Sequence, residues 1–129
     1  MNLLLDTHVA IWWLDDPARI PTHARVAIAE PANKVLVSAA TAWEMSIKHA
    51  QGKLRTPDNL QEELASDNIG ALAITLEHAV AAGALPRHHA DPFDRMLIAQ
   101  AQLEECTLVS FDRAFELYDV EVLNLRGAR

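Results

Sequence analysis

Short apolar runs alternate with longer amphipathic segments along the chain. The runs are four or five residues long and consist mostly of apolar residues, which is typical of buried strands. They cover residues 2–5, 34–38, 71–74, 107–110 and 120–123. The segments between them have the residue pattern of helices, and they cover residues 9–14, 22–30, 41–52, 57–65, 75–82, 92–105 and 112–117.

Residues at the ends of these segments support the division into helices. Asp91 followed by Pro92 matches an N-cap and the first position of a helix. Thr41 is expected to begin the helix over residues 41–52. Gly83 is expected to end the helix over residues 75–82. The helix over residues 92–105 is apolar around most of its circumference, so we expect it to pack between the sheet and another layer.

Strands that alternate with helices predict parallel pairing with right-handed crossovers. We therefore expect an α/β fold, a three-layer α/β/α sandwich with a mainly parallel central sheet of four to five strands. The chain has 129 residues and shows no repeat, low-complexity tract or long linker. This predicts a single domain over residues 1–125, followed by a short tail at residues 126–129.

Composition and charge narrow the possible functions. The chain has 11 Lys and Arg against 18 Asp and Glu, a net charge of −7, which disfavours a protein that binds the nucleic-acid backbone through a basic face. An enzyme that approaches phosphate through a cation is still compatible with this charge. The single cysteine, Cys106, allows no internal disulfide and fits the reducing cytoplasm. The sequence predicts neither a signal peptide nor a membrane span.

Four carboxylates stand where predicted strands or loops pass into helices, namely Asp6, Glu44, Asp94 and Asp112. In a parallel sheet the loops that follow the strands lie at the carboxyl edge, where ligands usually bind. Crowded carboxylates repel one another unless a cation neutralises them, and their oxygens suit Mg²⁺ or Mn²⁺. The spacing therefore suggests an acidic metal site, although it does not establish one.

Each acid also has a purely structural interpretation. Asp6 and Asp112 can be helix N-caps, and Asp94 can simply complement a helix dipole. Glu44 completes a capping-box pattern with Thr41. Glu44 can equally form an ion pair with Lys48 one turn later. These interpretations place the acids at the same edge of the sheet, so position alone does not separate them from a metal site.

Several blocks of the chain resemble the PIN-domain family, and more narrowly the VapC-type ribonuclease toxins of bacterial toxin–antitoxin pairs. The most specific blocks are the five residues 91–95 and the series Trp43-Glu44, Lys48 and Gly52-Lys53-Leu54. The other matching blocks follow in the family's order: Leu3–His8, Ser38–Glu44, Leu85–Ala90, Leu97–Ala101 and Leu108–Asp112. The resemblance covers almost the whole chain.

The resemblance implies a metal-dependent endoribonuclease that hydrolyses RNA phosphodiester bonds with Mg²⁺ or Mn²⁺. It carries the family's acidic quartet onto Asp6, Glu44, Asp94 and Asp112, which would be both catalytic residues and metal ligands. Ser110 stands where the family often has threonine, and it keeps the hydroxyl. The resemblance also implies a cognate antitoxin protein as partner and a homodimer.

Two other kinds of function stay open at the level of the sequence. A phospho-acceptor receiver domain, or a phosphatase with an aspartyl intermediate, is also a small α/β protein with acids at strand ends. Each would want a further acid beside the first strand, where this chain has Thr7 and His8. An interaction protein without catalytic activity is the remaining alternative.

Some residues near the acids keep two interpretations. Asp91 can assist a metal or simply cap its helix, and Lys48 and Arg95 can steer phosphate. The pair His88-His89 is interpreted as a solvated loop, with contact to substrate as the alternative. Trp12 and Trp13 carry more apolar surface than one helix face buries, so either the core or a surface for a partner can use them.

Overall fold

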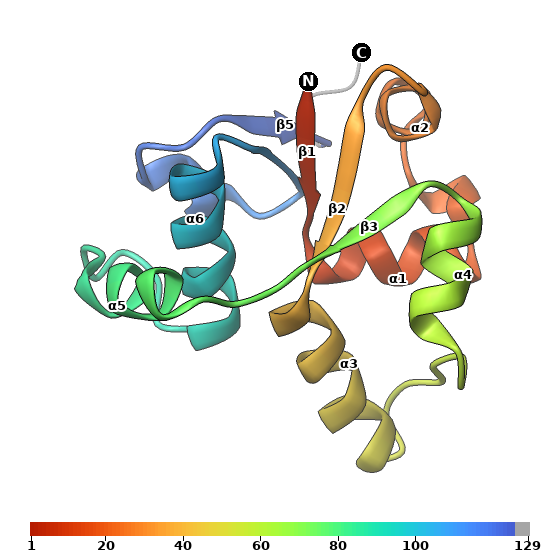
Figure 1. The fold of residues 1–129 in the computed structure, drawn as a ribbon, viewed down its shortest axis with the longest axis horizontal. Coiled ribbons are helices and arrows are strands. Elements are labelled where there is room, and N and C mark those ends of the chain that lie inside the picture. Colours follow the sequence, from red (N-terminus) through yellow and green to blue (C-terminus); the bar gives the residue numbers. More distant parts are fainter. Residues whose placement is uncertain (126–129) are drawn as a thin grey trace.

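Five strands form one sheet in which every pair of neighbours is parallel, in the order β3-β2-β1-β4-β5 (Figure 1). The computed structural model describes residues 1–125, and the predicted tail at 126–129 lies outside the described residues. The strands are β1 (Asn2–Leu5), β2 (Lys34–Ser38), β3 (Ile69–Leu72), β4 (Thr107–Ser110) and β5 (Val122–Asn124). The expected parallel α/β architecture is confirmed.

Helices connect the strands. The α-helices are α1 (Thr7–Asp15), α2 (Thr22–Ala29), α3 (Ala39–Ala50), α4 (Leu60–Ser66), α5 (Leu76–Ala84) and α6 (Pro92–Glu104). Two short 3-10 helices, η1 (Pro17–Arg19) and η2 (Arg113–Leu117), complete the described elements. Helices α1, α2 and α4 lie on one side of the sheet, and α5 and α6 lie on the other (Figure 1).

Alternate residues of the central strands fill two separate cores, as the period of a strand requires. In β1, Leu3 and Leu5 face the core shared with α1 and α2, whereas Leu4 faces the core shared with α6. Helix α6 packs against β4 and also against α5 and α3. Its wide apolar circumference is thus explained, and the sheet has helices on both faces.

Several expected element ends differ from the structure. The fifth strand is Val122–Asn124 rather than residues 120–123, and α4 is Leu60–Ser66 rather than residues 57–65. The third strand is Ile69–Leu72 rather than residues 71–74, because Ile69 pairs with Val35 and is buried. Helix α3 begins two residues before Thr41, because the Ser38 side chain accepts the N–H of Ala40 and so acts as the cap. Gly83 lies inside α5 rather than ending it.

Among the described residues, no helix has the length and apolar character needed to cross a bilayer.

Candidate active site

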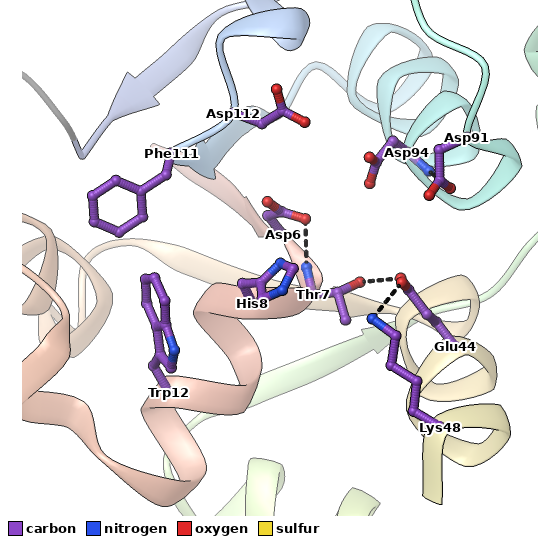
Figure 2. A pocket seen from close by; sticks show the side chains of 10 residues that line it. All are labelled: Asp6, Thr7, His8, Trp12, Glu44, Lys48, Asp91, Asp94, Phe111 and Asp112. Atoms are coloured by element: carbon purple, nitrogen blue, oxygen red, sulfur yellow. Dashed lines mark hydrogen bonds and ion pairs between the residues drawn. The ribbon is translucent and has the colours of Figure 1, made fainter. Parts of the chain in front are cut away.

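The carboxyl ends of β1 and β4 meet the middle of α3 and the first turn of α6 around one cavity of about 400 Å³. Figure 2 shows that the side chains of this cavity come from segments far apart in the sequence. Its lining includes all four acids named from the sequence. The lining residues are Asp6, Thr7, His8, Trp12, Glu44, Lys48, Asp91, Asp94, Phe111 and Asp112.

Asp6 follows β1 directly and is almost fully buried. Its Oδ1 accepts the backbone N–H of Thr7 at 2.7 Å, and its Oδ2 accepts the hydroxyl of Ser110 at 2.8 Å. Burial raises the pKa of the Asp6 carboxyl, and the hydrogen bonds from Ser110 and Thr7 oppose this rise. The position of Asp6 is therefore fixed by the fold at both oxygens.

Glu44 is held at the cavity by side chains rather than by its own helix end. The Thr7 hydroxyl donates to Oε1 of Glu44 at 2.8 Å, and the same hydroxyl lies 3.2 Å from that of Thr41. The Lys48 ammonium lies 3.1 Å from Oε2 of Glu44. The capping-box interpretation of Glu44 is wrong, because Ser38 caps α3, whereas the predicted ion pair with Lys48 is confirmed.

Asp94 and Asp91 stand at the start of α6, opposite the β1 side of the cavity (Figure 2). Asp91 is the N-cap, and its Oδ1 accepts the N–H groups of Phe93 and Asp94. Burial raises the pKa of the Asp94 carboxyl to about 7, and the negative charges of Asp6 and Asp91 add to that rise. Asp94 therefore carries a charge that the surrounding side chains leave poorly compensated.

Asp112 is the most exposed member of the quartet. It caps the 3-10 helix η2 through Oδ1, which accepts the N–H of Ala114. The Ser110 hydroxyl accepts the N–H of Asp112 at 2.9 Å while it donates to Asp6. Ser110 thus links two of the four acids, and the capping interpretation of Asp112 holds together with its place at the cavity.

His89 lies against two of the acids, which the sequence analysis did not predict. Its Nε2 is 2.8 Å from Oδ2 of Asp94 and 3.4 Å from Oδ2 of Asp112. Within the described residues, this nitrogen has no partner with the alignment of a hydrogen bond. Its Nδ1 accepts the N–H of Asp91 at 3.3 Å, which turns Nε2 toward the carboxylates. The solvated-loop interpretation is wrong for His89.

The contacts of Arg95 do not fit the predicted role in steering phosphate. Its guanidinium donates to the backbone carbonyls of five residues at the end of α5 and in the following loop. These carbonyl groups belong to Ala82, Gly83, Leu85, Pro86 and His89. Arg95 therefore shapes the loop that carries His89, because it satisfies carbonyl groups that a helix end leaves open.

The side chains at the cavity form a set of hard oxygen donors with one imidazole. One oxygen each of Asp94 and Asp112 and a nitrogen of His89 lie within 4.8 Å of one another. Carboxylate oxygens suit Mg²⁺ and Mn²⁺, and a divalent cation would offset the burial and the repulsion between carboxylates that together raise the pKa of Asp94. The residues present therefore fit a divalent metal ion.

The fold and the cavity define an α/β protein with an acidic site at the carboxyl edge of a parallel sheet. A model of the PIN domain matches residues 3–121. The chain belongs to the PIN-domain family. It is 32% identical over 115 residues to ribonuclease VapC22 of Mycobacterium tuberculosis, a match that covers 87% of this chain and 88% of the relative. The resemblance found in the sequence is thus confirmed.

Solved structures of toxin–antitoxin complexes share the fold. VapBC2 from Rickettsia felis, solved with a DNA fragment from its promoter, gives a TM-score of 0.71 at 15% identity and covers 96% of this chain and 98% of its own. A toxin–antitoxin complex from Klebsiella pneumoniae gives a TM-score of 0.65 at 18% identity, with 95% and 96% covered. At these identities the likeness concerns the fold alone.

Proposed function

We propose that this protein is a divalent-metal-dependent endoribonuclease that hydrolyses RNA phosphodiester bonds and acts as the toxin of a toxin–antitoxin pair. The observation that carries the proposal is the meeting of Asp6, Glu44, Asp94 and Asp112 at one cavity of a PIN-domain fold. The similarity to ribonuclease VapC22 supports the reaction class. The toxin–antitoxin complexes among the structural neighbours support the biological role.

The four acids are the proposed holders of the cation, with Mg²⁺ as the first candidate and Mn²⁺ as the second. When bound, such an ion supplies the positive charge that activates a water molecule and stabilises the charge developing on the phosphate. The chain itself contributes the placement of the ligands. Ser110 and the backbone of Thr7 hold the Asp6 carboxylate, and the Thr7 hydroxyl holds Glu44.

Lys48 supplies a positive charge at the same cavity and is half-buried beside Glu44. A cation that neutralises Glu44 would release this ammonium group to contact a phosphate of the RNA. The chain has a net charge of −7, so few other positive side chains are available to bind the phosphate. The phosphate-steering role predicted for Lys48 therefore remains part of the proposal.

The alternative of a phospho-acceptor module has weaker support. A carboxylate that accepts a phosphoryl group acts as a nucleophile, and the hydrogen bonds that both oxygens of Asp6 accept inside the protein weaken that nucleophile. Asp6 is also 7% exposed. The positions after Asp6 at which a second acid would be needed are occupied by Thr7 and His8, at the start of α1.

The test is cleavage of end-labelled structured RNAs by the purified protein with Mg²⁺, with Mn²⁺ and with EDTA. We expect cleavage with either metal and none with EDTA. Asp6→Asn and Asp94→Asn should remove the activity, whereas the exposed Asp58→Asn should retain it as a matched control. Cleavage that persists in EDTA, or in both site variants, would refute the metal-dependent mechanism.

The proposal extends to the partners and the cellular setting. We expect growth arrest when the protein is expressed alone in the bacterial cytoplasm, and rescue by a cognate antitoxin protein.

A homodimer is also proposed, and it is supported by Leu76 and Val80, which lie one turn apart on α5 and are 87% and 74% exposed. Sedimentation should show a dimer that L76S together with V80S converts to a monomer; a wild-type monomer would exclude it.

A further inference from the structure

One side of the acidic cavity is aromatic. Trp12 of α1 and Phe111, which follows β4, both line the cavity, and their ring centroids are 5.1 Å apart in an edge-to-face arrangement. Figure 2 shows these two rings on one side, with Asp91 and Asp94 on the opposite side and Asp6 and Asp112 between them. An ion at the carboxylates would therefore have aromatic surface next to it.

The cavity is larger than an ion requires. Its volume of about 400 Å³ lies within the roughly 300–1,000 Å³ that small-molecule sites occupy. The acids use only part of the lining, and the aromatic rings with His8 form the rest of one side. This leaves space for a group that is bound at the same time as the scissile phosphate.

Trp12 is held in place from several directions. The guanidinium of Arg19 lies over its ring, 4.7 Å from the centroid, and the His8 ring lies 6.2 Å away. Trp12 also packs against the core shared by β1, α1 and α2. A ring fixed in this way loses little freedom when a flat group stacks on it, and Arg19 adds a positive charge to an otherwise acidic protein.

A second tryptophan–phenylalanine pair provides a comparison within the same molecule. Trp43 and Phe93 directly precede the acids Glu44 and Asp94, and their rings are also 5.1 Å apart and edge-to-face. Trp43 is 62% exposed and is not among the residues that line the cavity. Proximity to an acid in the sequence therefore does not distinguish the two pairs, but position relative to the cavity does.

We propose that Trp12, supported by Phe111 and Arg19, is a stacking platform for one unpaired nucleobase of the RNA next to the phosphate held at the acids. Single-stranded RNA is recognised by stacking of its bases on aromatic side chains, which every base permits. A base paired in a duplex is not available for such stacking. The inference rests on the proposed ribonuclease function and gives it a preference for unpaired nucleotides.

The test is binding of short fluorescein-labelled single-stranded RNAs in the presence of Ca²⁺, followed by anisotropy. One RNA is intact, and each of the others has one abasic nucleotide at a successive position. With the wild-type protein, one abasic position should weaken binding about ten-fold. Trp12→Leu should weaken binding of intact RNA by a similar factor and should no longer respond to the abasic nucleotide.

Two variants control for indirect effects. Trp12→Phe keeps an aromatic ring and should retain most of the abasic response, and Trp43→Leu should behave as the wild type. An abasic response that is equal in Trp12→Leu and the wild type would overturn the inference. So would an abasic series in which no position matters to the wild-type protein.

A second measurement keeps Trp12 in place in case Trp12→Leu does not fold. In a protein with W13F and W43F, Trp12 is the remaining tryptophan. Intact RNA should quench its fluorescence, and the RNA that lacks the critical base should not; equal quenching or none would overturn the inference. Base-dependent binding without cleavage in Mg²⁺ or Mn²⁺ would refute the proposed function alone, and cleavage without base dependence would refute this inference alone.

Discussion

The two sides of the acidic cavity hold their carboxylates by different means. On the side of β1, both oxygens of Asp6 accept hydrogen bonds, from the Thr7 backbone and from Ser110. On the side of α6, no N–H or O–H group within residues 1–125 donates an aligned hydrogen bond to the Asp94 side chain, which faces His89 and other carboxylates.

This difference indicates how the site is assembled. Asp6 is placed by interactions that exist without any ion, so it belongs to the fold as much as to the site. Asp94 is placed by the start of α6, and its charge is opposed by burial and by its neighbours. We therefore expect a cation to gain most of its binding energy by neutralising the negative charge of the Asp94 carboxylate. The predictions below test the two sides separately.

The largest expected effect is on metal affinity when Asp94 is neutralised. Asp94→Asn should weaken Mn²⁺ binding at pH 8 by about a hundred-fold or more, because it removes the carboxylate that gains most from the ion. Titration calorimetry measures this directly. Asp58→Asn should leave the affinity unchanged, and an affinity in Asp94→Asn within three-fold of the wild type would contradict the assignment.

The same substitution should stabilise the protein when metal is absent. The folded-state pKa of Asp94 is raised from 3.8 to about 7, so the unfolded chain releases this proton first as pH rises. Wild-type stability then falls between about pH 4 and 7, and the loss is complete above that window. At pH 8 with EDTA, Asp94→Asn should raise the unfolding free energy by about 1–2 kcal/mol.

Denaturant melts at pH 4 and pH 8 check this sign. The gain should be small at pH 4, because Asp94 of the folded wild-type protein is still protonated there and carries no buried charge. If Asp94→Asn is less stable than the wild type at pH 8 without metal, other groups of the folded protein must compensate the negative charge of Asp94. In that case the contrast between the two sides would disappear.

His89 should matter for the α6 side of the site. His89→Ala should weaken Mn²⁺ binding about ten-fold, because residues that orient metal-binding carboxylates typically contribute ten- to a hundred-fold to affinity. His88→Ala provides a neighbouring control, since His88 is exposed and packs on Tyr118. Equal affinities for both variants and the wild type would show that the contacts of His89 with Asp94 and Asp112 have no part in binding.

The smallest effect is expected on the β1 side. Ser110→Ala removes the hydroxyl that donates to Asp6 and accepts from Asp112, and should lower the unfolding free energy by about 1–2 kcal/mol. Mn²⁺ affinity should fall less than five-fold, because the Thr7 backbone still holds Asp6. Ser110→Thr, which keeps the hydroxyl, should retain both properties. Loss of metal binding comparable to that of Asp94→Asn would contradict this ranking.

Much of the fold follows from the apolar runs. The runs at residues 2–5, 34–38 and 107–110 coincide with β1, β2 and β4, because leucine and valine in short runs have few alternatives to a buried strand. Residues 69–74 mix glycine and alanine with isoleucine and leucine, so their pattern does not fix which four residues pair. The register with β2, a tertiary interaction, decides it.

The site was only partly predictable for a related reason. The four acids were identified from strand ends and from resemblance, but a capping box and a cavity ligand have the same local pattern at Glu44. Only the buried Thr7 and Thr41, from two different helices, show where Glu44 points. The roles of His89 and Arg95 depend on a loop folded against α5 and α6, and no local spacing encodes such contacts.

The most direct test of the central claim is the number of protons released when Mn²⁺ binds. Titration calorimetry in buffers of different ionisation enthalpy measures this number at pH 6 and pH 8. Because an ion must displace the proton that Asp94 retains up to about pH 7, we expect release of about one proton at pH 6 and close to none at pH 8. Absence of Mn²⁺ binding, or binding without proton release at pH 6, would contradict the account.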